Sequence, residues 1–509
     1  MSNSVLTSFS GPYVSKLTKF LLVFGSVISV AGYLFWSQAV KRTGFPLDDA
    51  WIHQTYARNL AQSGEWFFLP GIRSAGSTSP LYTILLSLGY LLELNPFFWT
   101  YILGWICLLG IAVTGSAVFE AFEISIPKSG LWVGLFLIFE WHLVWAAVSG
   151  METLLFAWFV LLTLSCTLKK PVNWFATGVL IGTSVWLRPD GITLMGPIVF
   201  AVYFSENGWQ KRLKAILLVC LGVFILVAAY ASFNSWLGGN ILPNTFTAKQ
   251  VEYLELQKLP IWVRLAAQIK MLLIGGGLLL LPGFVFLFYS TIRKNLWDWL
   301  GWILWIFGYL FIFAWRLPVT YQHGRYAMPT MVIYFVIGMI GMKMLGKDLR
   351  SNDFWNRIII KGWVGATALV LVIFWFLGAN AYSQDVAVIE TEMVNTAKWI
   401  QQNTPADSLI AAHDIGAMGY FSNRNLIDLA GLVSPDVIPI IRDQNKLSAY
   451  LNQEEADYLV VFPGWYPQIT NCLEPLHVTN GHLSVNAGGE NMAVYSWTES
   501  NKKSDKCQN

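Results

Sequence analysis

Long apolar runs recur along the chain up to about residue 380, separated by short polar segments, and they predict membrane-spanning helices. A helix that crosses the hydrocarbon core needs about 17–25 mostly apolar residues. We assign about 11 runs to this class, two of them slightly short: 19–40, 98–118, 130–147, 152–168, 172–187, 191–205, 214–236, 265–289, 296–315, 327–346 and 359–380. The pattern therefore predicts a polytopic α-helical membrane protein.

Loop charge decides the place of one further apolar stretch, 79–93 (SPLYTILLSLGYLLE), which is shorter than a full span. If it does not cross and the N-terminus is cytoplasmic, the short cytoplasmic loops hold Lys128, Lys169, Lys170, Lys211, Arg212, Lys214, Arg293, Lys294, Lys347, Arg350 and Arg357. Short cytoplasmic loops carry an excess of Lys and Arg, and a crossing at 79–93 would move all of these residues outside. We therefore predict a juxtamembrane helix at 79–93 and a cytoplasmic N-terminus.

The hydrophobic pattern changes near residue 385. Segment 386–402 reads as an amphipathic helix, and 408–414 (SLIAAHD) and 456–462 (ADYLVVF) read as buried strands. We predict two domains, a transmembrane domain over 1–384 and a small extracytoplasmic α/β domain over 385–509.

Composition supports the membrane class. Hydrophobic residues make up 55% of the 509 residues and charged residues 12%, whereas soluble domains carry about 25% charge. A net charge of +3 gives no support to nucleic acid binding. The five cysteines show no metal-ligand spacing, and Cys472 and Cys507 could pair if their region is extracytoplasmic.

Two adjacent carboxylates, Asp48 and Asp49, directly follow the first predicted span. Asp48 alone would cap the helix that begins AWIHQTYARNL, so capping leaves the second carboxylate unexplained. Neighbouring carboxylates repel, which raises one pKa and suits a general base that faces a hydroxyl group. Glu152, in SGMET at the same membrane face, is a third catalytic candidate, although an acid at a helix start also complements the helix dipole.

Cationic and polar side chains are predicted at the same face. Any one cation could simply reach toward phospholipid headgroups, and Asp190 could pair with Arg188 in the turn RPDG. As a set they could hold a phosphate ester, and an asparagine in LPNTF suits sugar hydroxyls. The candidate donor-binding residues are Arg58, Arg73, Arg188, Asn244, Lys249, His323, Arg325 and Tyr326.

This combination favours transfer of a sugar from a lipid phosphate. A carboxylate deprotonates an acceptor hydroxyl, which attacks the anomeric carbon. Phosphate is a good leaving group, so the site needs cations rather than a strong general acid. We expect no cofactor; a divalent cation is compatible with this chemistry but is not predicted.

Several motifs resemble, in order, those of GT-C fold glycosyltransferases. They are DDAWIHQTYARNLAQSGEWFFLPGIRSAGSTSPLYTILLSL, SGMET, RPDG, LPNTF and HGRYAMP, and they span about residues 20–350. The resemblance is nearest to the bacterial group that includes mycobacterial arabinofuranosyltransferases. One departure is that SGEWFFLPGIRSAGSTSP lacks the usual aromatic residue before Thr-Ser-Pro. The C-terminal AAHDIGAMGYFSNRNLIDLAGLVSP also resembles domains appended to such enzymes.

The resemblance implies an inverting glycosyltransferase of the bacterial cytoplasmic membrane. It implies a polyprenyl-phosphate sugar donor, a glycan or glycolipid acceptor, and a catalytic Asp in the first loop, with Asp48 as the first choice and Asp49 as the second.

Two other classes fit the sequence less well. A transporter or flippase of lipid-linked saccharides should show inverted repeats and broken helices at mid-membrane, whereas most ionisable residues here lie in loops. A phospholipid hydrolase would need a nucleophile constellation or a metal cluster, and His53, His323 and His413 are scattered along the chain.

Overall fold

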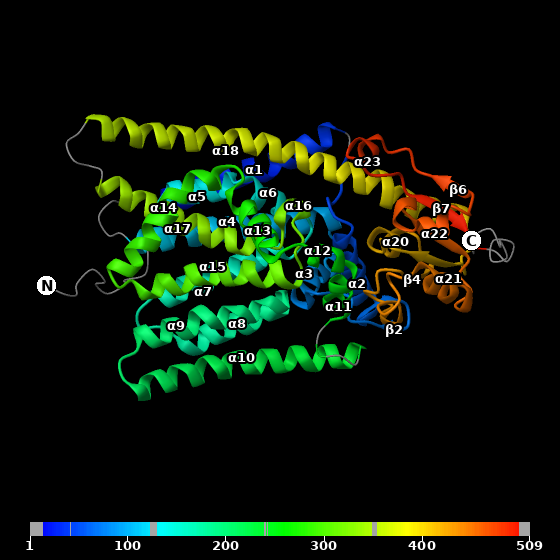
Figure 1. Ribbon diagram of the computed structural model, residues 1–509, viewed down its shortest axis with the longest axis horizontal. Helices are drawn as coiled ribbons and strands as arrows, with labels where there is room; N and C mark the ends of the chain where they lie inside the picture. The colour runs from blue at the N-terminus through cyan, green and yellow to red at the C-terminus, as the bar shows by residue number, and fades with distance from the viewer. Residues whose placement is uncertain are drawn as a thin grey trace.

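The computed structural model describes residues 14–40, 42–122, 130–238, 241, 243–348 and 354–497. Most of the chain is helical, and the helices run mainly along the long axis of the molecule, with a small α/β part at one end (Figure 1). The helices before the C-terminal part are α1 (Lys16–Ala39), α2 (Asp49–Ser63), α3 (Pro80–Leu91), α4 (Pro96–Phe122), α5 (Gly130–Phe139), α6 (Trp141–Ala147), α7 (Thr153–Leu168), α8 (Trp174–Leu187), α9 (Met195–Ser205), α10 (Trp209–Gly238), α11 (Asn244–Glu252), α12 (Leu254–Gln257), α13 (Ile261–Leu273), α14 (Gly276–Arg293), α15 (Trp297–Arg316), α16 (Tyr321–Gly324), α17 (Met328–Asp348) and α18 (Phe354–Ile389).

Seven of the described helices are long and apolar enough to cross a membrane: α1, α4, α10, α14, α15, α17 and α18. The bent pair α5 and α6 would make an eighth span. The three remaining expected spans form α7, α8 and α9, with 16, 14 and 11 residues, the last preceded by the 3₁₀ turn Pro189–Leu194. These lengths fall short of a full span, so the count of 11 stays a prediction.

The expected continuous span over 265–289 is wrong, because the chain breaks there into α13 and α14. Gly275 lies between them with φ of +73°, a conformation that glycine adopts without strain. On α13, Gln268 Nε2 donates to the Val319 carbonyl at 3.1 Å, and Arg264 Nη1 donates to the Ala314 carbonyl at 2.8 Å. The polar face of α13 therefore binds the end of α15 and the loop that follows, and only α14 has the length of a span.

The expected span over 130–147 bends by 62° between α5 and α6. Glu140 lies at the bend, where its carboxylate accepts a hydrogen bond from the Leu143 amide at 3.2 Å and caps α6. A buried side-chain cap satisfies amides that a continuous helix would have bonded internally, which accounts for the change of direction.

Stretch 79–93 forms α3, a helix of 12 residues that packs against α2. At about 1.5 Å per residue its length is roughly 18 Å, well short of a hydrocarbon core of about 30 Å. The short helix is confirmed, and its place at the membrane surface stays a prediction.

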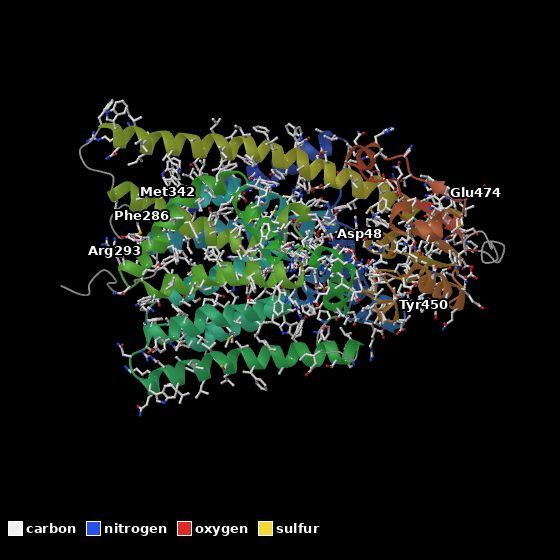
Figure 2. The ribbon with its side chains drawn as sticks, viewed as in Figure 1. Asp48, Phe286, Arg293, Met342, Tyr450 and Glu474 are labelled. Atoms are coloured by element: carbon white, nitrogen blue, oxygen red, sulfur yellow. The ribbon has the colours of Figure 1, made fainter. Side chains whose placement is uncertain are left out.

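Basic loops meet at the end of the bundle opposite the α/β part. Lys170 Nζ lies 2.5 Å from Ser205 Oγ and 3.6 Å from Asp298 Oδ2, which joins three of these loops. Arg293 lies at the same end, far from Asp48 (Figure 2). Lys128 and Arg350, from the same set of predicted cytoplasmic residues, lie outside the described residues.

The C-terminal part is built on a five-stranded sheet of order β4-β3-β5-β7-β6. Strands β3 and β5 lie within the two predicted strand segments, which are therefore confirmed; β4, β3 and β5 are parallel, whereas β7 and β6 pair antiparallel. The strands are β3 (Leu409–Ala412), β4 (Asn425–Asp428), β5 (Tyr458–Val461), β6 (Pro475–Val478) and β7 (Ala493–Ser496), and the helices are α19 (Asn395–Asn403), α20 (Gly416–Phe421), α21 (Gln444–Gln453), α22 (Pro467–Thr470) and α23 (His482–Asn486).

Helix α18 joins the two parts of the molecule. It runs from the basic end of the bundle to the α/β part, where a π-helical turn, Glu390–Val394, leads into α19 (Figure 1). The expected domain boundary at residues 384 and 385 therefore falls inside a continuous helix. Cys507 lies outside the described residues, so the question whether it pairs with Cys472, which the sequence leaves open, stays open.

The charge of the loops and their common end generate a prediction of topology. A reporter enzyme that is active only in the cytoplasm, fused after residue 400, should be silent because we predict that the α/β part lies outside. The same reporter fused after Lys294 should be active, since basic loops stay inside. Activity of the first fusion, or silence of the second, would overturn the orientation.

Candidate active site

Asp48 does not cap its own helix. Both of its carboxylate oxygens instead accept hydrogen bonds from the C-terminal part, at 2.6 Å from the Gly416 amide and 2.8 Å from the Ala417 amide. These amides open α20, so Asp48 holds the α/β part against the first loop. Burial raises the pKa of Asp48, and the neighbouring carboxylate of Asp414 raises it further, against the two backbone hydrogen bonds.

Gly416 permits this close approach. A Cβ atom at that position would lie 2.0 Å from the Asp48 carbonyl oxygen and 2.7 Å from Asp48 Oδ2. Any larger residue would have to push the first loop and α20 apart, so the contact requires glycine.

Asp49, the first residue of α2, faces a different set of partners. Its Oδ2 atom accepts hydrogen bonds from Lys249 Nζ at 3.0 Å and from Arg325 Nη2 at 2.6 Å. Burial alone would raise the pKa of Asp49, but the charges of Lys249 and Arg325 outweigh it and hold the pKa well below its usual value. Among the described residues, the Oδ1 atom accepts no hydrogen bond.

Arg325 is 4% exposed, and its Nε and Nη1 atoms have no hydrogen-bond partner among the described residues. Its third nitrogen, Nη2, contacts Asp49 and the Tyr326 hydroxyl, the latter at 3.1 Å. Buried N–H groups nearly always have partners, and a guanidinium offers donors in a geometry that matches phosphate or carboxylate. The free side of Arg325 is therefore a candidate position for an anionic ligand.

A second ionic group lies beside the first. Glu152 Oε1 accepts from Arg188 Nη1 at 3.2 Å, and Glu152 Oε2 lies 3.5 Å from His53 Nε2. Arg188 Nε also donates to Asp190 at 3.1 Å, which confirms the predicted pairing within RPDG. Glu152 makes no cap bond to α7, so it holds Arg188 and His53 in place.

Two cavities flank the Asp49 ion pairs. The first, here called the junction cavity, has a volume of about 760 Å³ and lies between the bundle and the α/β part. The second, here called the apolar cavity, has a volume of about 370 Å³ and is lined in part by Ile192, Phe246, Ile312, Phe313 and Leu317. The residues that line both are Asp49, Ile52, Lys249, Arg325, Tyr326 and Leu432. Asp48, labelled in Figure 2, marks where the bundle meets the α/β part.

The structure brings together six of the predicted site residues at or beside this shared wall: Asp49, Glu152, Arg188, Lys249, Arg325 and Tyr326. Arg188 and Glu152 line the apolar cavity, and Asp48 lines the junction cavity. The acids and cations at or beside this wall thus come from five separate parts of the sequence.

Four predicted donor-binding residues lie elsewhere. Arg58 donates to the Tyr420 carbonyl at 2.8 Å, and Arg73 lies over the Trp236 ring at 4.4 Å. His323 contacts Asp385 at 2.7 Å in a separate cavity of about 440 Å³. Asn244 is buried at the first residue of α11. Their role in donor binding stays a prediction.

Sequence reasoning missed the residues that the C-terminal part adds. His413 and Asp414 directly follow β3 and line the junction cavity, and Trp465 and Tyr466 follow β5 there. The sequence did carry a signal, because polar residues just after parallel strands often face a site. Glu252, at the end of α11, gave no comparable signal.

No three His, Cys, Asp or Glu side chains are arranged to hold a metal ion within the part of the chain that the structure describes.

Comparisons with known proteins support the fold. A family described as a domain of unknown function (DUF8728) matches residues 380–495. A comparison of the sequence with curated proteins finds no match.

Solved structures of similar fold include ArnT from Cupriavidus metallidurans bound to undecaprenyl phosphate, with a TM-score of 0.60 and 13% identity over 95% of this chain and 98% of that one. They also include an Archaeoglobus fulgidus oligosaccharyltransferase in complex with Zn and sulfate, with a TM-score of 0.58 and 10% identity over 87% of this chain and 67% of that one. AglB from the same organism, in complex with an inhibitory peptide and a dolichol-phosphate, gives a TM-score of 0.56 and 10% identity over 88% and 70%. This chain is thus a multi-pass membrane protein with the GT-C fold.

The close contact at Gly416 predicts the effect of one methyl group. Gly416→Ala should destabilise the protein by about 1–3 kcal/mol, the usual cost of overpacking, and lower the midpoint of thermal unfolding. Gly365→Ala in α18 is the matched control, since a Cβ atom there meets open space. Equal midpoints for the two variants would contradict the contact.

The carboxylates at the junction predict a pH dependence of stability. Burial raises the pKa of both Asp48 and Asp414 in the folded state, above the unfolded value of about 3.9. The stability that the two protonated carboxyl groups contribute is therefore lost as the pH rises through their raised pKa values. The thermal midpoint should fall from about pH 5 to about pH 8, and Asp414→Asn should flatten the fall. If the thermal midpoint of Asp414→Asn falls with pH as steeply as that of the wild type, the effect of Asp414 on Asp48 is contradicted.

Proposed function

We propose that this chain is an inverting glycosyltransferase that moves a sugar from a polyprenyl-phosphate donor to a hydroxyl acceptor at the extracytoplasmic face of a bacterial cytoplasmic membrane. The observation that carries the proposal is Arg325, a buried guanidinium with two unpaired nitrogen atoms, Nε and Nη1, in the wall between the apolar cavity and the junction cavity. ArnT with undecaprenyl phosphate and AglB with a dolichol-phosphate, which share the fold, support this ligand class.

The apolar cavity suits the lipid end of such a donor. Its aliphatic and aromatic lining includes Ile192, Ile312 and Phe246, which are partly exposed at the surface of the helical bundle. A polyprenyl chain could therefore approach from the membrane, while its phosphate reaches Arg325 and Lys249 at the inner wall. Arg188, held by Glu152 and Asp190, lines the same cavity and adds positive charge.

The phosphate would compete with Asp49 for the two cations. Before donor binding, Asp49 shares one oxygen between Lys249 and Arg325 and is a weak base, because both charges lower its pKa. A bound phosphate takes over these contacts and adds negative charge beside the carboxylate, and both effects raise the pKa of Asp49. Asp49 thus becomes an effective base only when the donor is present.

In the transfer step the acceptor oxygen bonds to the anomeric carbon as the bond from that carbon to the phosphate oxygen breaks. The hydroxyl proton passes to the carboxylate, and the electron pair leaves with the phosphate. Lys249 and Arg325 stabilise the charge on the departing phosphate. Attack from the face opposite the phosphate inverts the configuration at the anomeric carbon.

The sequence resemblance places Asp48 first among the catalytic candidates, whereas the contacts support Asp49. Asp48 uses both oxygens to hold α20, and Asp49 keeps Oδ1 free beside both cavities. We therefore propose Asp49 as the base and Asp48 as the residue that positions the α/β part. We also retain 11 spans and an extracytoplasmic domain over 385–509 as parts of the proposal.

Charge removal at the cations tests donor binding. Arg325→Ala and Lys249→Ala should each lose a charge-assisted contact of about 1.5–3 kcal/mol, which is roughly a 10- to 150-fold loss. The loss is measured as release of polyprenyl phosphate from a panel of labelled polyprenyl phosphosugars. Arg293→Ala, at the opposite end of the bundle, is the control. If both cavity variants release polyprenyl phosphate at the normal rate, the charges of Arg325 and Lys249 have another role. If the wild type binds the donor but never releases polyprenyl phosphate from it, a transporter is favoured.

Substitution of the acids tests the base. Asp49→Asn keeps the size of the side chain but removes its ability to accept a proton, so transfer should fall by roughly 10²–10⁴-fold while donor binding persists. Asp48→Asn should lower the thermal midpoint, because its amide group would face a backbone N–H. If Asp49→Asn transfers normally and Asp48→Asn does not, the order given by the sequence resemblance is the right one.

A further inference from the structure

We infer that the surface contributed by the C-terminal part to the junction cavity is the acceptor subsite, and that it takes an uncharged saccharide. The inference rests on the proposed function and deepens it by naming the acceptor class. It also gives a role to the region matched by the family of unknown function, 380–495.

The subsite is built at the carboxyl ends of two parallel strands. His413 and Asp414 follow β3, and Trp465 and Tyr466 follow β5. His413 Nδ1 lies 2.7 Å from the Tyr466 hydroxyl, and its Nε2 lies 3.7 Å from Glu252 Oε1 on α11. This chain of contacts connects the α/β part to the helix that carries Lys249.

Asp414 and Trp465 leave contacts unfilled that a ligand could make. Asp414 Oδ2 is buried and has no hydrogen-bond partner among the described residues, which is rare for a buried polar atom. Trp465 is 52% exposed although it lines the cavity and its ring centroid lies 4.8 Å from that of His413. A free carboxylate oxygen accepts from a hydroxyl group, and an open aromatic ring covers an apolar face. A sugar ring offers both kinds of surface.

The charges lining the cavity select against an acidic acceptor. Each cation there already contacts a carboxylate: Lys249 and Arg325 contact Asp49, and Arg442 contacts Glu255 at 2.5 Å. Among the described residues, Asp48 and Asp414 contact no cation. In the proposed reaction the donor phosphate occupies the free side of Arg325. An anionic acceptor would then meet Asp48 and Asp414 without a free cation, so a neutral saccharide is favoured.

The subsite is also placed for the proposed reaction. Asp49 lines both cavities, so a hydroxyl group in the junction cavity can reach it while the donor phosphate occupies the apolar cavity. The acceptor oxygen then bonds to the anomeric carbon, and its proton passes to Asp49.

The test uses the full chain in lipid nanodiscs on a glycan array that carries neutral, amino-bearing and acidic glycans. We expect binding to neutral glycans, reduced roughly tenfold or more by Asp414→Ala and by Trp465→Ala, each of which removes one contact. Trp209→Ala replaces an exposed tryptophan at the start of α10 and should bind like the wild type.

Three results would each overturn the inference. They are binding restricted to acidic glycans, binding that the two cavity variants leave unchanged, and no glycan binding at all, which a polypeptide acceptor would give. Release of polyprenyl phosphate is measured on the same samples. Donor release without neutral-glycan binding would reject the subsite alone, whereas neutral-glycan binding without donor consumption would reject the proposed transferase.

Discussion

The contact of one carboxylate with two cations fixes the relative positions of three segments around the candidate site. Asp49, Lys249 and Arg325 come from α2, α11 and the segment before α17, and they meet in the wall between two cavities. Charges removed from water are costly unless each has a partner, so the group ties three segments to one arrangement. A donor phosphate offers the same charge as the carboxylate and can replace it. The two cations thus hold the resting structure together and, in the proposed function, also select a phosphate as the ligand.

The neighbouring carboxylate connects this group to the C-terminal part. Asp48 accepts two amide hydrogen bonds at the start of α20, while Asp49, one residue later, faces the cations. A shift of the α/β part would therefore move the acid pair as well. Helix α18 adds a continuous connection, since it runs from the bundle to the π-helical turn before α19. The α/β part is thus a wall of the site rather than a separate appendage.

Local patterns predicted much of the fold, and long-range contacts account for what they missed. Apolar runs predicted the helices, and the runs at 408–414 and 456–462 predicted β3 and β5. Hydropathy could not show the bend at Glu140, because a single capping carboxylate barely changes the mean hydropathy of a span. Likewise, the acid pair predicted chemistry, but not that Asp48 would bind amides more than 360 residues away. The role proposed for Asp414 could not be predicted from the sequence, because only the folded sheet places this residue in the junction cavity.

If the donor phosphate displaces Asp49 from its cations, a structure of the protein with bound polyprenyl phosphate should show the phosphate between Lys249 and Arg325. The phosphate oxygens should lie on the free Nε and Nη1 atoms of Arg325, and the Asp49 carboxylate should have moved away from the present 2.6 Å contact. A phosphate bound elsewhere, with the Asp49–Arg325 contact unchanged, would show that no such displacement occurs.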